Sequence, residues 1–419
     1  MDKIKIRKGL DIRLAGAPSK HLECFEPTSC AIKPTDFIGV VPKLHVAEGD
    51  EVNVGSVLFH DKNNERIVFT SPVSGKVNAI VRGEKRAILE VIVESDGKNE
   101  SLDFSSIDNP IERMLRSGIW PLLRQRPFAT IANPDDKPKH IFISMFDTAP
   151  LAPDNDFIVG NQLDALAEGI KILSRLTDGN VFLNVNHDIN QNDFPDNVVV
   201  TRFSGPHPAG NVGTQINAIS PINKGETVWY CYPQDVITIG KLFLTGRYDS
   251  TRVIAMTGSA AHDPHYYHTR IGADITPICK DVACGIRIIS GNVLTGTNIT
   301  GDNHLGFYDS QVTMIPEGNE YRLFGWLRPI TKRFSNTNTN GDTRPYIMTG
   351  QFERVFPFDI YPMHLIKACL IKDIDQMEEL GIYEIDAEDF ALCEVIDPSK
   401  TEIQQIIREG LEFIRKETN

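Results

Sequence analysis

Residues able to hold a ligand gather in one loop of the sequence. The run Phe203-Ser-Gly-Pro-His-Pro-Ala-Gly-Asn-Val-Gly213 follows a predicted strand, at the edge where open α/β sheets place ligands. Its glycine spacing matches neither the dinucleotide nor the phosphate-loop motif, and its two prolines remove amide donors. Such a loop suits a flat neutral ring or a protein surface better than a phosphate, with a purely structural turn as the alternative. The candidate contact residues are Gly205, Pro206, His207, Pro208, Ala209, Gly210 and Gly213.

Two further groups raise the question of a metal. His262-Asp-Pro-His-Tyr-Tyr-His268 holds three histidines, but Pro264 predicts a loop, so packing is favoured over a zinc site. The seven cysteines include no Cys-x-x-Cys, and only Cys279 and Cys284 lie close together in the second half. Reduced, buried thiols are therefore expected, without a disulfide, zinc or iron-sulfur cluster. No Ser-His-Asp, Cys-His or paired-carboxylate arrangement stands out, so no catalytic, metal-binding or cofactor-binding residue is predicted.

The elements around these residues change in type along the chain. Residues 33 to 96 predict short strands, with Gly49 and Gly55 at turns that need positive φ. Val46 to Leu58 followed by Ser71 to Val77 resembles the hammerhead of biotinyl and lipoyl carrier domains. The lysine in the carrier position is Lys62. Its hairpin is expected to be longer than a carrier hairpin and lacks a Met-Lys-Met context, so a solvated loop lysine is predicted rather than a modified one.

Residues from about 100 to 257 alternate between strand and helix patterns, which predicts a Rossmann-like α/β layer. A helix is expected from Gln162, with Gly179 as its C-terminal stop. A second helix is expected over Asp235 to Leu244. The predicted strands are Lys139 to Met145, Val181 to Val185, Asn197 to Phe203 and, closing the series, Arg252 to Met256.

The remainder predicts a small β-rich module and then helices. The module ends near Phe324-Gly-Trp-Leu327, and the polar run Ser335 to Asp342 reads as a linker. Met363 to Glu379 and Glu402 to Arg415 have helical periodicity. The expected fold is thus multidomain α/β. Its expected units are 1–100 (all-β, biotinyl/lipoyl-like), 101–257 (Rossmann-like α/β), 258–335 (β-rich) and 336–419 (helical).

Charge and hydropathy limit the partners. The formal net charge is -13 at pH 7, which disfavours nucleic acid and anionic lipid head groups. The N-terminus has no secretory h-region, and no run approaches the roughly 18 apolar residues of a membrane span. A cytoplasmic protein is expected, with membrane association only through partners.

Several long strings resemble one family over essentially the whole chain. They include Ile6 to Pro18, Gly118 to Phe128, Phe203 to Gly210, Pro233 to Phe243 and Glu353 to Ile360. Leu323 to Trp326 and Glu388 to Cys393 follow in the same order. Together they are similar to the A subunit of the sodium-translocating NADH:quinone oxidoreductase.

The resemblance implies a peripheral protein on the cytoplasmic face of the bacterial inner membrane, docked chiefly on the membrane-embedded B subunit. The complex of six proteins uses NADH, FAD, FMN, iron-sulfur centres, quinone and Na+. The implied domains are a barrel-sandwich hybrid, a Rossmann-like domain, a β-grasp/SLBB-like module and a helical domain. The related NADH-binding subunit of complex I and the C subunit of the Rnf complex use a Gly-Arg-Gly-Gly-Ala-Gly run and cluster cysteines that this sequence lacks. Asp397 also stands where many members have a second cysteine after Cys393.

Three functions remain open at this point. The chain contributes to quinone binding or access without a redox cofactor of its own. Alternatively, it is a cofactor-free scaffold for the B subunit. As a third possibility, it is a nucleotide- or flavin-binding dehydrogenase subunit related to the C subunit of the Rnf complex.

Overall fold

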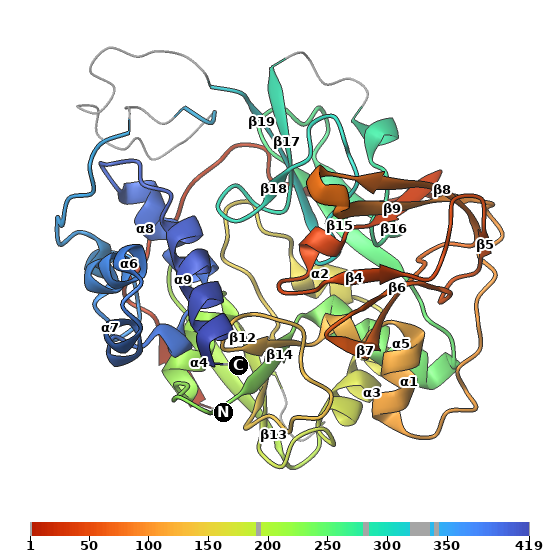
Figure 1. Cartoon of the computed structure of the whole chain (residues 1–419), viewed down its shortest axis with the longest axis horizontal. Coiled ribbons are helices and arrows are strands. Elements are labelled where there is room, and N and C mark those ends of the chain that lie inside the picture. The colour runs from red at the N-terminus through yellow and green to blue at the C-terminus, as the bar shows by residue number, and fades with distance from the viewer. Residues whose placement is uncertain (1, 190–193, 280–284, 319–335, 339–342, 419) are drawn as a thin grey trace.

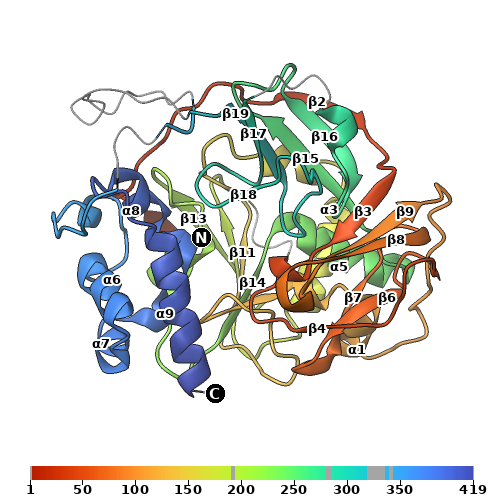
Figure 2. The same ribbon diagram turned by 45° about the horizontal axis from the view of Figure 1, so that its top comes forward.

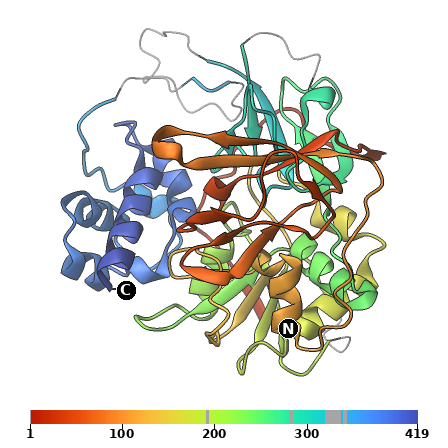
Figure 3. The ribbon, with the colours of Figure 1, turned by 45° about the vertical axis from the view of Figure 1, so that its right-hand side comes forward.

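In the part of the chain that the structure describes, four β-sheets and a separate group of C-terminal helices can be distinguished (Figure 1). The computed structural model describes residues 2–189, 194–279, 285–318, 336–338 and 343–418. In Figure 3 the N-terminal β domain, in red and orange, lies in front, with the second large sheet (teal) above it and the α/β sheet (yellow to green) below it. Within these described ranges, no helix has the length and apolar character needed to cross a membrane.

The N-terminal β domain consists of two small sheets whose facing side chains form a core. Gly49 and Gly55 have φ of +98° and +92°, which confirms the predicted need for glycine at both turns. Phe59 and Phe69 stack inside with ring centroids 4.5 Å apart. The expected all-β barrel-sandwich domain is confirmed. Its strands are β3 (Ser29–Ile32), β4 (Pro42–Leu44), β5 (Glu51–Val52), β6 (Val57–Asp61), β7 (Asn64–Thr70), β8 (Gly75–Arg82) and β9 (Ile88–Ser95).

The hairpin that carries Lys62 is shorter than the sequence suggested. Asp61 pairs with Asn64 across β6 and β7, so only Lys62 and Asn63 connect the strands. The Asp61 carboxylate accepts the Asn63 amide hydrogen at 3.1 Å, and such an Asx turn closes a tight connection. The expectation of a longer hairpin was wrong. Lys62 itself is exposed, as predicted for a solvated lysine.

The α/β sheet has the order β1-β13-β12-β11-β14-β10. Neighbouring strands are parallel except for the antiparallel edge strand β10. If β11 to β14 are numbered one to four along the chain, their order in the sheet is three, two, one, four. This is the strand order of half of a doubly wound sheet. Helices α3 (Leu163–Leu173) and α5 (Pro233–Thr245) contribute to the core on one face, and α4 (Val212–Ile219) covers the other. The strands are β1 (Asp2–Lys5), β10 (Arg124–Arg126), β11 (Ile141–Ser144), β12 (Val181–Val185), β13 (Val198–Ser204) and β14 (Val228–Cys231).

Two details of the predicted α/β series were wrong. Helix α3 ends at Leu173, and Gly179 instead forms the turn before β12, where an added Cβ would lie 1.9 Å from the Lys139 carbonyl oxygen. Strand β15 (Thr251–Thr257) does not close this sheet, because β10 already occupies the position beyond β14. β15 pairs with β16 (His265–Arg270) and β19 (Gln311–Pro316) in the second large sheet instead.

The second large sheet has the order β18-β17-β19-β15-β16-β2 and confirms the small β-rich module. The expected end of the module at 324–327 lies outside the described residues, as does most of the linker at 335–342. The remaining strands of the sheet are β2 (Ser19–Cys24), β17 (Ile286–Ser290) and β18 (Thr297–Asn298).

The N-terminal segment 2–24 completes two sheets outside the β domain with which it was grouped. Strand β1 pairs in parallel with β13 at the edge of the α/β sheet. Strand β2 pairs in parallel with β16 at the edge of the second large sheet. The segment therefore ties both large sheets together. The division at 100, 257 and 335 stays a prediction.

The C-terminal helices form their own core, and Figure 2 shows them gathered at one side of the molecule. The helix expected over 363–379 is two helices, because Lys372 has φ of +55° and the Asp373 carboxylate accepts the Gln376 amide hydrogen at 3.1 Å. A side-chain cap of this kind starts a new helix. The helices are α6 (Pro362–Ile371), α7 (Ile374–Glu379), α8 (Ala391–Ile396) and α9 (Ile403–Thr418). Two short helices, α1 (Pro110–Ser117) and α2 (Asn155–Val159), precede the α/β strands β10 and β12.

Candidate functional site

The predicted loop after β13 is largely interior. Gly205 is exposed and Pro206 is partly exposed, while His207, Pro208, Ala209, Gly210 and Gly213 are buried. Gly205 has φ of +139°, and an added Cβ would lie 2.3 Å from the Ile6 carbonyl oxygen. The absence of a side chain at Gly205 therefore allows two backbone segments to approach each other closely. Of the seven candidate residues, only Gly205 and Pro206 remain available to a ligand or a partner.

His207 is held by contacts within the chain. Its side chain is 3% exposed, and Nδ1 lies 3.2 Å from Thr148 Oγ1. Its amide donates to the Asp11 carboxylate at 2.9 Å, and its carbonyl accepts the Leu10 amide hydrogen at 2.9 Å. Burial lowers the pKa of His207 to about 4, because the charged imidazolium is poorly solvated inside. The imidazole is neutral at neutral pH.

His207 should make stability depend on pH. Because its folded pKa lies below the unfolded value of about 6.5, stability is present above pH 6.5 and is lost as the pH falls toward 4. We expect a loss of about 2 kcal/mol from this group. In His207→Asn, the part of the pH dependence of the unfolding free energy that comes from His207 should vanish. Urea unfolding at several pH values between 7 and 4.5 measures this slope. His364→Asn, at an exposed histidine, is the control; equal slopes in both variants would contradict the assignment.

Gly213 lies against the helical region. An added Cβ at Gly213 would lie 2.4 Å from Asp389 Oδ1. The first turn of α4 can therefore approach the Asp389 carboxylate only because residue 213 has no side chain. The other oxygen, Asp389 Oδ2, accepts from Arg126 Nη1 at 2.9 Å. Arg126 Nη2 donates to Glu388 Oε1 at 2.7 Å and lies 3.9 Å from Asp386 Oδ2. We call Arg126, Asp386, Glu388 and Asp389 the Arg126 network.

The histidine run does not converge on one point. His265 and His268 belong to β16, so the predicted loop ends at Pro264, because the following residues pair with β2 and β15. Their side chains point to opposite faces, since the two positions differ by three along a strand. His265 Nε2 lies 3.2 Å from Glu23 Oε2, and its Nδ1 lies 2.7 Å from the Asp263 carbonyl oxygen. His265 is therefore packed among protein groups, whereas His262 is exposed.

The described cysteines are unbonded thiols, and only Cys24 among them is exposed. Burial raises the pKa of Cys279 to about 12 and that of Cys369 to about 12. Cys284 lies outside the described residues. The buried thiols that the structure describes are thus protonated at neutral pH, and protonated thiols are poor nucleophiles.

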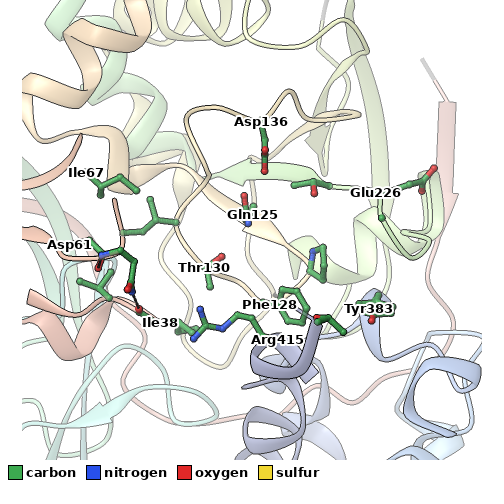
Figure 4. Close-up of a pocket in the computed structure, with 18 of the residues that line it drawn as sticks. Ile38, Asp61, Ile67, Gln125, Phe128, Thr130, Asp136, Glu226, Tyr383 and Arg415 are labelled. Carbon is green, nitrogen blue, oxygen red and sulfur yellow. Dashed lines mark hydrogen bonds between the residues drawn. The ribbon is translucent and has the colours of Figure 1, made fainter. Parts of the chain in front are cut away.

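A cleft of about 480 Å³ opens where the β domain, the edge strand β10 and the C-terminal helices meet (Figure 4). Ligand pockets commonly have volumes of this order. No residue of the loop 205–213 lines it. The lining comes from four separate stretches: Ile38, Gly39, Val40, Asp61, Asn63 and Ile67; Gln125, Pro127, Phe128, Thr130, Ile131 and Asp136; Lys224, Gly225, Glu226 and Thr227; and Tyr383, Arg415 and Thr418.

The two cations that line the cleft differ in their partners. Lys224 pairs with Glu378 at 2.7 Å, whereas Arg415 has no ion pair or side-chain hydrogen bond to any residue that the structure describes. Figure 4 shows Arg415, Phe128 and Tyr383 along one side of the cleft. A guanidinium there can donate to a carbonyl oxygen of a bound ring.

The hairpin beside the cleft has an uncommon backbone. Phe128 and Ala129 have φ of +79° and +53°, a region that residues other than glycine rarely adopt. The Phe128 ring meets the Tyr383 ring edge to face, with centroids 6.1 Å apart. Such conformations cluster at functional sites. Periodicity and motif spacing did not locate this cleft, since its walls come from distant parts of the chain.

The fold defines a class before any relative is considered: a multidomain α/β protein with a barrel-sandwich β domain, a parallel α/β sheet, a second β-rich sheet and C-terminal helices. Three family models match it: the NqrA N-terminal barrel-sandwich hybrid domain over residues 4–96, the NqrA second alpha/beta domain over 108–248, and the NQRA C-terminal domain over 253–301. The chain belongs to the NqrA family, the A subunits of the Na(+)-translocating NADH-quinone reductase.

Curated relatives match over nearly the full length. The A subunit from Vibrio atlanticus (strain LGP32) is 38% identical over 99% of this chain and 100% of its own. The proteins from Serratia proteamaculans (strain 568) and Neisseria meningitidis serogroup B are each 37% identical with the same coverage. Among solved structures, an NAD+-reducing [NiFe]-hydrogenase in the H2-reduced state matches with a TM-score of 0.39 and 10% identity, covering 74% of this chain and 61% of that one. That similarity is too weak to show a fold.

Proposed function

We propose that this chain is a peripheral component of a sodium-pumping NADH:quinone reductase that contributes a quinone contact and carries no redox cofactor of its own. In this proposal it lies on the cytoplasmic face of the bacterial inner membrane. It docks chiefly on the membrane-embedded B subunit. Membership of the NqrA family supports the complex, and the missing flavin run and cluster cysteines support the absence of a cofactor.

The observation that carries the quinone contact is the position of Arg415, which is unpaired among the described residues and lines the cleft together with Phe128 and Tyr383. A quinone head group is a flat neutral ring with carbonyl oxygens as acceptors. Ile38, Ile67 and Phe128 give apolar and aromatic surface, while Arg415 offers donors for a carbonyl oxygen. A strongly anionic ligand fits less well, because Asp61, Asp136 and Glu226 also line the cleft.

Removing the Arg415 guanidinium should weaken quinone binding. A hydrogen bond from a charged donor contributes about 1.5–3 kcal/mol, so Arg415→Leu should raise the Kd for a short-chain ubiquinone at least about tenfold. Calorimetric titration of the purified chain measures this directly. Lys416→Leu is the matched control, because Lys416 is exposed and pairs with Glu412 on the same helix. Equal affinity in the two variants would remove the cleft as the quinone contact.

The loop after β13 has a narrower role in this proposal. Gly205 and Pro206 are offered as a contact for a neighbouring protein of the complex, because they alone among the seven candidate residues retain exposed surface. The buried members, from His207 to Gly210 and Gly213, position the N-terminal segment and the helical region instead.

Two alternatives make different predictions. A cofactor-free scaffold would bind no quinone, and its deletion would abolish assembly of the complex without changing quinone affinity. A flavin-binding dehydrogenase subunit related to the C subunit of the Rnf complex would purify as a yellow protein. An absorbance spectrum followed by flavin release on denaturation separates this case from the other two.

A further inference from the structure

The flat face of the Arg415 side chain lies against Gly39 of the β domain. A Cβ added at Gly39 would lie 2.8 Å from Arg415 Nη1 and 3.0 Å from both Cζ and Nη2. Three nearly equal distances to a planar group mean that its face, and not its edge, is turned toward the glycine. The guanidinium group of Arg415 therefore occupies the space that a side chain at position 39 would fill.

This packing leaves the hydrogen-bond donors of Arg415 free. The N–H bonds of a guanidinium group lie in its plane, so a group that packs through its face keeps its donors pointing sideways. Gly39 and Arg415 both line the cleft, and Arg415 has no ion pair within the described ranges. The glycine can thus hold the guanidinium group beside the cleft without using a donor that a ligand needs.

A tight turn fixes the backbone at Gly39. The Val40 amide donates to the Phe37 carbonyl oxygen at 3.3 Å, and Gly39 has φ of +81°. A positive φ at the third residue of a four-residue turn is characteristic of type II, which favours glycine there. Phe37 is buried in the core of the β domain. The first half of the turn is therefore anchored by packing.

The β6–β7 hairpin holds the second half of the turn. Asp61 Oδ1 accepts the Val41 amide hydrogen at 3.0 Å, and the Val41 carbonyl oxygen accepts the Lys62 amide hydrogen at 2.8 Å. Asn63 Nδ2 donates to the Gly39 carbonyl oxygen at 3.3 Å. The hairpin that carries a lysine in the position of a carrier lysine therefore supports the turn beside the cleft.

The geometry points to Gly39 as a positioning residue for the quinone contact, which acts by holding the guanidinium group of Arg415 at the cleft. This assignment rests on the function proposed above. A side chain at position 39 would displace the guanidinium group, and the flexible arginine can move away without a shift of the backbone. The β domain then contributes to the contact through a missing side chain.

Gly39→Ala should raise the Kd for a short-chain ubiquinone about tenfold, as expected for Arg415→Leu, because both changes remove the guanidinium group from the ligand. Adding Gly39→Ala to Arg415→Leu should cause no further loss, since a residue that acts only through Arg415 has no effect in its absence. Gly97→Ala is the control for backbone strain. Gly97 lies outside the cleft and has φ of +73° with open space around an added Cβ, so its Kd should stay at the wild-type value.

A measurement without quinone follows the arginine directly. The Arg415 Nε–Hε signal in an NMR spectrum, identified by its loss in Arg415→Leu, should shift in Gly39→Ala and stay in place in Gly97→Ala. If Gly39→Ala does not fold, Gly39→Asn replaces it, because asparagine adopts positive φ more readily and brings the same Cβ.

The outcomes separate this assignment from the proposed function. An unmoved NMR signal, an unchanged Kd in Gly39→Ala where Arg415→Leu raises it, or a further rise in the double variant would overturn the role of Gly39 alone. If Arg415→Leu leaves the Kd unchanged, the quinone contact itself fails, and the role of Gly39 in it is overturned as well.

Discussion

Arg126→Met is expected to lower the free energy of unfolding by about 3–5 kcal/mol, because the substitution leaves the buried Asp389 carboxylate without its cation. Arg126 is 0% exposed, and its partners Asp386 and Asp389 are buried with it. The Arg126 network crosses from β10 to the helical region. Loss of the guanidinium should therefore detach these helices from the α/β sheet.

Urea unfolding followed by circular dichroism measures the loss, and limited proteolysis shows whether residues 343–418 become sensitive first. The penalty should be larger at pH 8 than at pH 5.5, since protonation at the lower pH neutralises the abandoned carboxylates. Arg116→Met is the control, because that arginine is exposed and has only a 3.9 Å contact with Glu112. Equal stability of the two variants would show that the network does not hold the interface.

Gly9→Ala is expected to cost roughly 3 kcal/mol or more, from backbone strain together with overpacking. Gly9 has φ of +150°, and an added Cβ would lie 2.1 Å from the His207 carbonyl oxygen. That oxygen also accepts the Leu10 amide hydrogen at 2.9 Å. The clash cannot be relieved by a side-chain rotation, because the backbone fixes the position of the alanine Cβ and the other atom is a backbone carbonyl oxygen. The N-terminal segment should separate from the loop after β13.

A matched glycine isolates the contact from the backbone conformation. Gly97 has φ of +73° with nothing near the added Cβ, so Gly97→Ala should lose only about 1–2 kcal/mol. Both variants are compared by thermal unfolding and by hydrogen exchange of residues 2–24. Gly9→Ala with no greater effect than Gly97→Ala would show that the segment can shift without cost.

Sequence patterns predicted those features of the fold that depend on residues close to one another in the sequence. The turns at Gly49 and Gly55 and the helical periodicity from Ile403 to Ile414 depend on neighbouring residues, and both are found. Strand partners depend on the rest of the chain, which is why β15 was placed in the wrong sheet and β1 and β2 were grouped with the β domain.

The site was harder to predict for the same reason. Gly213 was predicted only as a candidate contact residue, and what requires a glycine there is Asp389, far along the chain. The cleft depends on Phe128, Tyr383 and Arg415 meeting in space. No spacing rule connects residues from separate domains, so only the assembled structure brings them together.

The strands of segment 2–24 are translated long before their partners. Asp2 pairs with Thr201, and Cys24 pairs with His268. About 199 further residues (201 − 2) must therefore be translated after Asp2 before β1 can pair. At about 5–20 residues per second this takes roughly 10–40 s on the ribosome. Lys3, Lys5, Lys20 and Glu23 put charge on both waiting strands, and charged strand edges resist aggregation. These charges can thus keep β1 and β2 of the nascent chain soluble until their partner strands β13 and β16 have been translated and can pair with them.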